Sequence, residues 1–144
     1  MVEPGLEGAF PGLRGQPYRT TSPSTDRFNC IAFAAGDDSN WWWPDKAGQD
    51  LWPHGVARAE TVDAFREAFA TLGYVVCNDE QPEAGHDKVA IFALAGVPKH
   101  AARQLSTGRW VSELGPSEDI EHGLHDLAGT AYGAVVLIMK RPVP

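Results

Sequence analysis

Apolar residues at helical spacing mark two segments in the first half of the chain. The first predicted helix runs from Asp26, which suits an N-cap, to Ala35, and Gly36 is placed to end it. The second begins after Thr61 as its cap and ends at Gly73. Their apolar faces are formed by Phe28, Ile31, Ala32 and Ala35 in the first helix and by Val62, Phe65, Phe69 and Leu72 in the second.

Shorter apolar runs in the second half predict strands. They cover residues 74–77, 88–94, 99–105, 109–114 and 133–139, and the last run is apolar throughout, as in a strand covered on both faces. Between the last two runs, residues 116–127 are predicted as a short helical or turn segment with Ser117 as its cap.

The loop Ser106-Thr107-Gly108 predicts a tight hairpin, a type I turn closed by Gly in the left-handed region. This register pairs Leu105 with Arg109. One face of the hairpin then carries His100, Ala102, Gln104, Trp110 and Ser112. A slip of one residue would turn Glu113 to that face instead of Ser112, because side chains alternate along a strand.

The elements together predict an α+β fold, with N-terminal helices packed on one side of a mostly antiparallel sheet of four to five strands. Residues 1–24 are rich in Gly, Pro, Ser and Thr and are predicted as an irregular N-terminal arm. Residues 25–144 are predicted as a single domain, large enough to bury a core without disulfides or metal.

Composition narrows the classes of function. The formal net charge of −7 over 144 residues argues against nucleic-acid binding, which needs clustered Lys and Arg. The two cysteines show no Cys-x-x-Cys spacing and are expected to be free thiols in a reducing compartment. No apolar run approaches a membrane span and no signal core begins the chain, so a cytoplasmic protein that binds no membrane is expected.

The order of Cys30 and His100 is the main clue to chemistry. A Cys early on a helix followed by a His on a later strand is the order that thiol hydrolases use, since an imidazole is needed to form the attacking thiolate. The helix N-terminus would lower the pKa of the Cys30 thiol. In this hypothesis Cys30 is the nucleophile and His100 takes its proton, while Ser112 or Gln104 orients the imidazole.

Two further assignments belong to the same hypothesis. Glu113 and Asp119 are alternative orienting groups, the first by register and the second by reach. The Asn29 side chain, together with the backbone N–H of Cys30, is a candidate donor to the substrate oxyanion.

In order and spacing the chain resembles papain-like thiol enzymes, including NlpC-type and CHAP-type cell-wall amidases. The resemblance implies a papain-like cysteine hydrolase fold. The chain is also similar to an uncharacterised bacterial family for which no activity is implied. That similarity extends from Phe28 to Pro142 and rests on the segments Asn29-Cys30-Ile31-Ala32, Trp41-Trp42-Trp43-Pro44, His100-Ala101-Ala102-Arg103-Gln104 and Asp119-Ile120-Glu121-His122.

Tryptophans and histidines supply two more candidate sites. The segment 37–54 is predicted as a packed loop in which Trp41 and Trp43 seal the core, whereas Trp42 stacks on the arm or forms an aromatic wall for a peptide or glycan. Asp119, His122 and His125 recur every three residues and could ligate a metal on a helix, but Gly123 interrupts that helix. A solvated helix face is favoured, so no metal and no cofactor are expected.

Two functions of different classes follow. The first is a small thiol hydrolase, amidase or deamidase acting on an amide bond of a peptide or small molecule, with Asn29, Trp42 and Gln104 near the substrate. The alternative is a non-catalytic binding or immunity-type protein whose acidic surface and tryptophan-rich loop dock a basic protein partner.

Overall fold

The computed structural model describes residues 4–22, 27–77, 79–114 and 119–143, with the backbone alone described for residues 4 and 5. Its helices are α1 (Pro4–Ala9), α2 (Cys30–Ala35) and α3 (Val62–Ala70), with two 3-10 turns, η1 (Pro11–Leu13) and η2 (Leu124–Leu127). Its strands are β1 (Arg19–Ser22), β2 (Val75–Cys77), β3 (His86–Leu94), β4 (Val97–Gln104), β5 (Trp110–Ser112), β6 (Asp119–His122) and β7 (Ala134–Pro142). In the part of the chain that is described, no helix is both long and apolar enough to cross a membrane.

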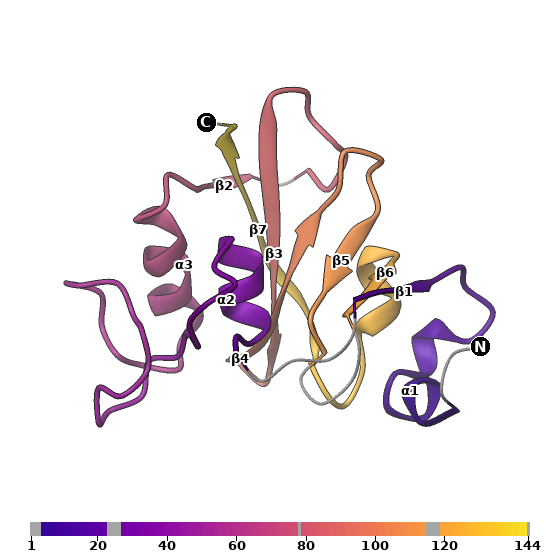
Figure 1. The fold of residues 1–144 in the computed structure, drawn as a ribbon, viewed down its shortest axis with the longest axis horizontal. Coiled ribbons are helices and arrows are strands. Elements are labelled where there is room, and N and C mark those ends of the chain that lie inside the picture. The colour runs from indigo at the N-terminus through magenta and orange to yellow at the C-terminus, as the bar shows by residue number, and fades with distance from the viewer. Residues whose placement is uncertain (1–3, 23–26, 78, 115–118, 144) are drawn as a thin grey trace.

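All seven strands form one antiparallel sheet in the order β1-β6-β5-β4-β3-β7-β2 (Figure 1). The predicted fold of four to five strands with N-terminal helices packed on one side, of papain-like type, is therefore wrong. Two strands were missed. β1 carries four exposed residues and so shows no apolar pattern, and β6 lies in the segment predicted to be helical or turn-like.

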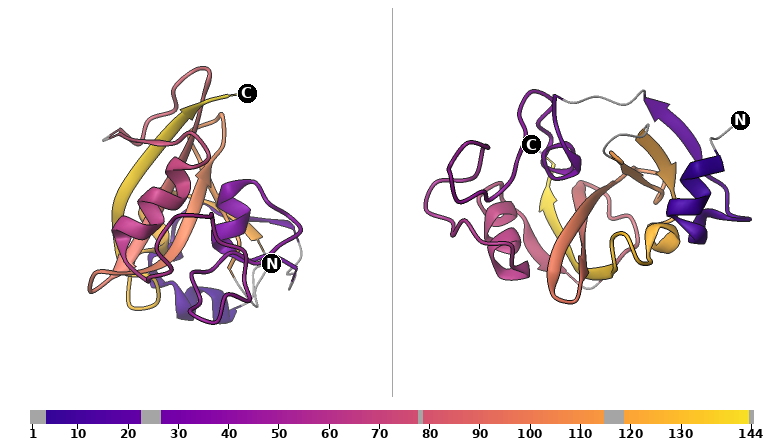
Figure 2. Two further views of the ribbon diagram at one scale, coloured as in Figure 1. Left: turned by 90° about the vertical axis from the view of Figure 1, so that its left-hand side faces the viewer. Right: turned by 90° about the horizontal axis from the view of Figure 1, so that it is seen from below.

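The central strand β3 is buried on both faces, and its successive residues point to opposite sides of the sheet. Val89 and Ile91 pack with α2 and α3, whereas Ala90 and Phe92 belong to a second cluster of buried residues. In the views of Figures 1 and 2, α3 lies toward the β2 end of the sheet and α1 beside β1.

The N-terminal arm, predicted to be irregular, contains α1, η1 and β1. Leu6, Phe10 and Leu13 from this arm are buried and contribute to the second cluster. Their spacing of four and three residues is helical, but Gly and Pro between them mask the pattern.

Several local predictions are confirmed. Thr61 caps α3, its hydroxyl accepting a hydrogen bond from the backbone N–H of Ala64 at 3.1 Å. In the hairpin, the N–H of Leu105 donates to the Arg109 carbonyl at 2.8 Å and Gly108 has φ +91°, as the predicted turn requires. Gly36 follows α2 in the left-handed region. The start of α2 differs, because Asn29 is its N-cap and Asp26 lies outside the described residues.

Candidate functional site

Cys30 opens into a pocket at the start of α2. The half-buried thiol lies against the backbone of β4, where its Sγ is 4.0 Å from the carbonyl oxygen of Lys99. The backbone N–H of Ala101 is close enough to favour the charged form of the sulfur. The pocket has a volume of about 360 Å³ and is lined by Asn29, Cys30, Trp41, Trp43, Asp50, Glu113 and Tyr132.

The Cys30 thiol is neutral in the resting protein. Burial raises its pKa to about 12, and the charge of the neighbouring Glu113 carboxylate acts in the same direction. Backbone N–H groups at Ala101 and at the start of α2 oppose this shift without overcoming it. The sequence-based expectation of a lowered thiol pKa is therefore wrong, because the six-residue helix contributes less than burial does.

His100 begins a buried chain of side-chain hydrogen bonds. Its Nε2 lies 2.9 Å from the Ser112 hydroxyl, which in turn lies 2.7 Å from Nε2 of His122. Nδ1 of His122 lies 2.7 Å from the carbonyl oxygen of Gly123. His100, Ser112 and His122 have no exposed surface. The hairpin register thus places Ser112 on the face of His100, as predicted.

The Gly123 carbonyl fixes the direction of every hydrogen bond in this chain. A carbonyl can only accept, so His122 Nδ1 carries the proton and its Nε2 is the acceptor. The Ser112 hydroxyl then donates to His122 and accepts from His100 Nε2–H. In a neutral His100 the remaining Nδ1 is therefore a bare lone pair, and it is buried without a hydrogen-bond partner among the described residues.

Both imidazoles are held neutral. Burial lowers the pKa of His100 well below its usual value, and protonation of the nearby His122 at low pH would lower it further. Burial lowers the pKa of His122 to about 4, against a smaller opposing effect of its bond to Gly123. The Tyr132 ring stacks on His100 with ring centres 4.1 Å apart and planes 3° from parallel. Tyr132 also lines the Cys30 pocket, so it separates that space from the His100 ring.

No hydrogen bond joins Cys30 to His100 among the described residues. Ala101, next to His100 on β4, packs in the core cluster of α2, while His100 packs in the second cluster, 5.3 Å from the Phe92 ring. Consecutive strand residues point to opposite sides, so the thiol and the imidazole approach β4 from different faces. The sulfur nevertheless contacts the backbone on both sides of His100.

The residues predicted near the substrate fall in different places. Asn29 lines the pocket, and its amide is anchored to the backbone: Oδ1 accepts from the N–H groups of Ala32 and Trp42, and Nδ2 donates to the Trp42 carbonyl. Trp42 is buried, and its ring N–H donates to Asp37. Gln104 lies at the far end of β4, where its amide donates to the Glu80 carbonyl. Neither Trp42 nor Gln104 lines the Cys30 pocket.

The predicted roles of Trp41 and Trp42 are reversed, while Trp43 packs against the core as predicted. Trp42 seals the core, whereas Trp41 is 42% exposed and Trp43 is half-buried, and both line the pocket. The local sequence pattern does not show the isolated parallel bridge between Trp42 and Leu51. This pairing determines which of the tryptophan side chains point into the core. Trp41 is therefore a pocket residue that the sequence interpretation assigned to the core, and Trp43 is a core contact that also lines the pocket.

The acidic and histidine stripe is not helical. Asp119 and His122 lie on β6, and only His125 falls in the 3-10 turn that follows. Burial raises the pKa of Asp119 to about 6, and His125 pairs with Glu80 at 2.8 Å. The described residues contain no cluster of three or more His, Cys, Asp or Glu side chains suited to a metal ion. Ser117, the predicted cap, lies outside these residues.

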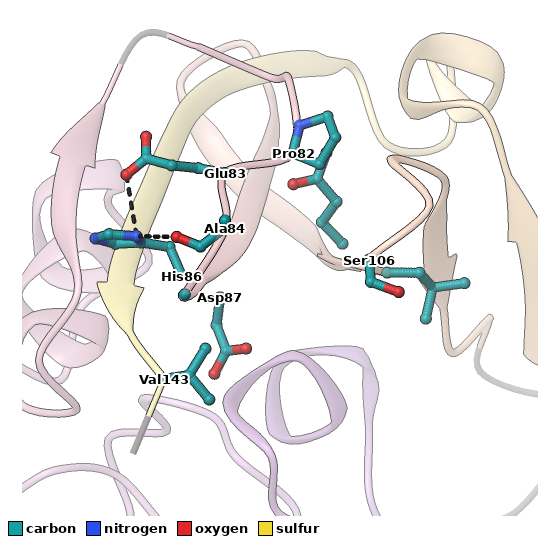
Figure 3. Close-up of a pocket in the computed structure, with 10 residues that line it drawn as sticks. Pro82, Glu83, Ala84, His86, Asp87, Ser106 and Val143 are labelled. Atoms are coloured by element: carbon teal, nitrogen blue, oxygen red, sulfur yellow. Dashed lines mark hydrogen bonds and ion pairs between the residues drawn. The ribbon is translucent and has the colours of Figure 1, made fainter.

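A larger pocket of about 480 Å³ lies at the opposite end of β3 and β4 (Figure 3). Its charged groups are already paired: Glu83 with Lys140 at 2.9 Å and with His86 at 3.0 Å, and Asp87 with Arg141 at 3.4 Å. Ser106 lines it too, but Figure 3 marks no hydrogen bond from Ser106 to His86 or to the carboxylates. The smaller pocket at Cys30 is therefore the better candidate site.

Removing the Ser112 hydroxyl should destabilise the protein. Ser112→Ala leaves the Nε2 atoms of His100 and His122 buried without a partner, which costs roughly 2 kcal/mol of unfolding free energy. Urea unfolding measures this loss. Ser106→Ala, an exposed change in the hairpin loop, is the matched control and should stay within about 0.5 kcal/mol of the parent. Equal stability of the two variants would contradict the hydrogen-bond chain.

Comparison with known proteins supplies a family. No curated protein and no solved structure matches the chain. A family model described as a domain of unknown function, DUF7689, matches residues 19–140, from β1 to the last third of β7 and including Cys30 and the His100 chain. Since this match spans most of its length, the chain belongs to the DUF7689 family.

Proposed function

We propose that the chain is a thiol hydrolase, an amidase or deamidase in which Cys30 attacks an amide bond of a peptide or small molecule. The observation that carries the proposal is the bare lone pair of His100 Nδ1, buried beside the strand backbone that the Cys30 sulfur contacts. A nucleophilic thiol needs a proton acceptor of this kind. The bond from His100 Nε2 to Ser112 holds the imidazole in the accepting tautomer.

The proposed reaction uses two groups of this chain. The Cys30 proton moves to His100 Nδ1, and the thiolate attacks the carbonyl carbon and forms a thioester as the carbon–nitrogen bond breaks. His100 then returns the proton to the leaving amine. Water hydrolyses the thioester with His100 again as the base, which regenerates the thiol.

The resting geometry requires movement before the first step. The thiol is neutral and not hydrogen-bonded to the imidazole, and Tyr132 covers one face of His100. The thiol and the imidazole also approach β4 from different faces, so the proposed transfer requires a substrate to displace the Tyr132 ring and the Cys30 side chain to turn toward His100. Catalytic hydrogen bonds that form only in the complex are common.

Three variants test the proposal by turnover of a panel of acyl amides with a fluorogenic leaving amine. Cys30→Ser and His100→Asn should each reduce turnover by about a thousandfold or more, while Cys77→Ser should leave it unchanged. Mass spectrometry should find the acyl group on Cys30 in the wild type. Undiminished turnover in Cys30→Ser, or an acyl group on another residue, would refute the proposal.

A second candidate is a binding protein that has no catalytic activity. It is favoured by Trp41, which is 42% exposed at the mouth of the pocket and offers a ready contact for a basic partner. This function predicts equal partner binding by the wild type and Cys30→Ser, with no turnover of any amide.

A further inference from the structure

We propose that the pocket at Cys30 selects a substrate group that carries a positive charge, an alkylammonium or guanidinium, held between Trp41 and Trp43 and facing Asp50 and Glu113. The inference rests on the proposed function only in taking this pocket as the substrate site.

The aromatic walls are fixed in place. The backbone groups of Trp41 and Trp43 form hydrogen bonds with the backbone of Leu51, with N–O distances of 3.0 and 3.2 Å. These bonds join the two ends of the segment 41–51, the tryptophan loop. Trp43 also packs edge-on against Phe65 of α3, with ring centres 5.5 Å apart. Preorganised indole rings attract cations through the negative faces of their π systems.

Two carboxylates line the same space. Asp50 is half-buried and Glu113 almost fully buried, and the described lining residues include no Lys, Arg or His. Arg58 lies near Asp50, but its ion pair is with Asp45 at 2.9 Å. Its hydrogen bond to Asp50 goes to the backbone carbonyl of that residue. Among the described residues no ion pair involves the Asp50 carboxylate, so its charge acts on whatever enters the pocket.

Size and overall charge agree with this assignment. A cavity of about 360 Å³ lies at the small end of ligand sites and suits a single basic side chain with its amide. The chain's formal charge of −7 raises the local concentration of cations and disfavours anions. The larger pocket at the other end of the sheet offers no comparable site, because Lys140 and Arg141 already pair with its carboxylates.

Labelling of Cys30 tests the charge preference without any hydrolysis. In Cys77→Ser protein, three methanethiosulfonates of similar size are compared, bearing an ammonium, a neutral methyl or a sulfonate group. Each forms a mixed disulfide with Cys30 and releases methanesulfinate, which mass spectrometry follows. The ammonium reagent should react about tenfold faster than the neutral one, and the sulfonate slowest.

Two carboxylate variants locate the effect. Asp50→Asn should reduce the ammonium-to-neutral rate ratio about two- to fivefold, whereas Glu60→Gln, the same charge change at an exposed residue outside the pocket, should leave it unchanged. A ratio of one, or equal ratios in the two variants, would overturn the inference.

An equilibrium measurement covers the case in which the buried thiol reacts too slowly to label. N-acetyl-lysine amide should cause a saturable change in tryptophan fluorescence that N-acetyl-norleucine amide, its neutral analogue, does not cause. Equal responses, or none, would contradict the charge preference.

The two proposals can fail separately. Turnover retained in Cys30→Ser would remove the hydrolase proposal. An ammonium-to-neutral rate ratio of one, in a protein whose turnover depends on Cys30, would remove only the cationic substrate.

Discussion

Lowering the pH from about 6.5 to about 4.5 should remove about 3 kcal/mol from the free energy of unfolding. The unfolded chain binds protons at both histidines below their ordinary pKa of 6.5, whereas burial keeps His100 and His122 neutral in the folded state. A base whose folded pKa is lowered contributes stability that is complete above its unfolded pKa and is lost as the pH falls. Each histidine then costs about 1.4 kcal/mol per pH unit over this window.

Asp119 opposes part of this loss. Burial raises its pKa to about 6, so the folded state takes up a proton there that the unfolded state does not bind until about pH 4. Its side chain has almost no exposed surface, and this uptake stabilises the folded state by about 2 kcal/mol over the same window. Against about 5 kcal/mol from the two histidines, the net loss is about 3 kcal/mol.

Urea unfolding across this pH range measures the effect. His122→Gln should reduce the loss from about 3 to roughly 0.5 kcal/mol, because it removes the contribution of one histidine while Asp119 still opposes that of His100. His54→Gln, which removes an exposed histidine, should leave the slope unchanged. A stability that is independent of pH between 6.5 and 4.5, or a slope unaltered in His122→Gln, would show that the imidazoles are accessible to protons in the folded protein.

The elements with strong local signals could be predicted from the sequence, and those stabilised by tertiary contacts could not. Thr61 begins α3 and Gly108 closes the hairpin because each residue type suits one backbone position. β1 consists of exposed polar residues and exists because it pairs with β6. Pairing between segments about a hundred residues apart leaves no trace in local periodicity, so the seven-stranded sheet could not be read from the pattern.

The site shows the same division. The turn chemistry set the register that brings Ser112 to His100. The pKa of Cys30 depends instead on how deeply the sulfur is buried and on the approach of Glu113, which are properties of the packed molecule. Likewise, alternation along the chain shows that Trp41 and Trp42 face opposite ways but cannot say which of them is outside.

Asn29 is the residue whose loss should most disturb the pocket, because it joins the start of α2 to the tryptophan loop. Its Oδ1 accepts from Ala32 N–H at 3.0 Å, which caps the helix, and from Trp42 N–H at 3.1 Å. Its Nδ2 donates to the Trp42 carbonyl at 2.7 Å. These bonds hold Trp42 in the core and so set the positions of Trp41 and Trp43 on either side.

We expect Asn29→Ala to lower the free energy of unfolding by about 3 kcal/mol, of which about 1 is the helix cap and about 1 is each buried bond to Trp42. Thr61→Ala, which removes the cap of α3 and no loop contact, should cost about 1 kcal/mol and isolates the capping contribution. Urea unfolding gives both values. Asn29→Ala should also weaken the preference of Cys30 for the ammonium reagent, since the indole walls lose their anchor, whereas Thr61→Ala should preserve it. If Asn29→Ala costs no more than Thr61→Ala and keeps the charge preference, then Asn29 is only a helix cap and the tryptophan loop is held by other contacts, such as the bond from the Trp42 ring to Asp37.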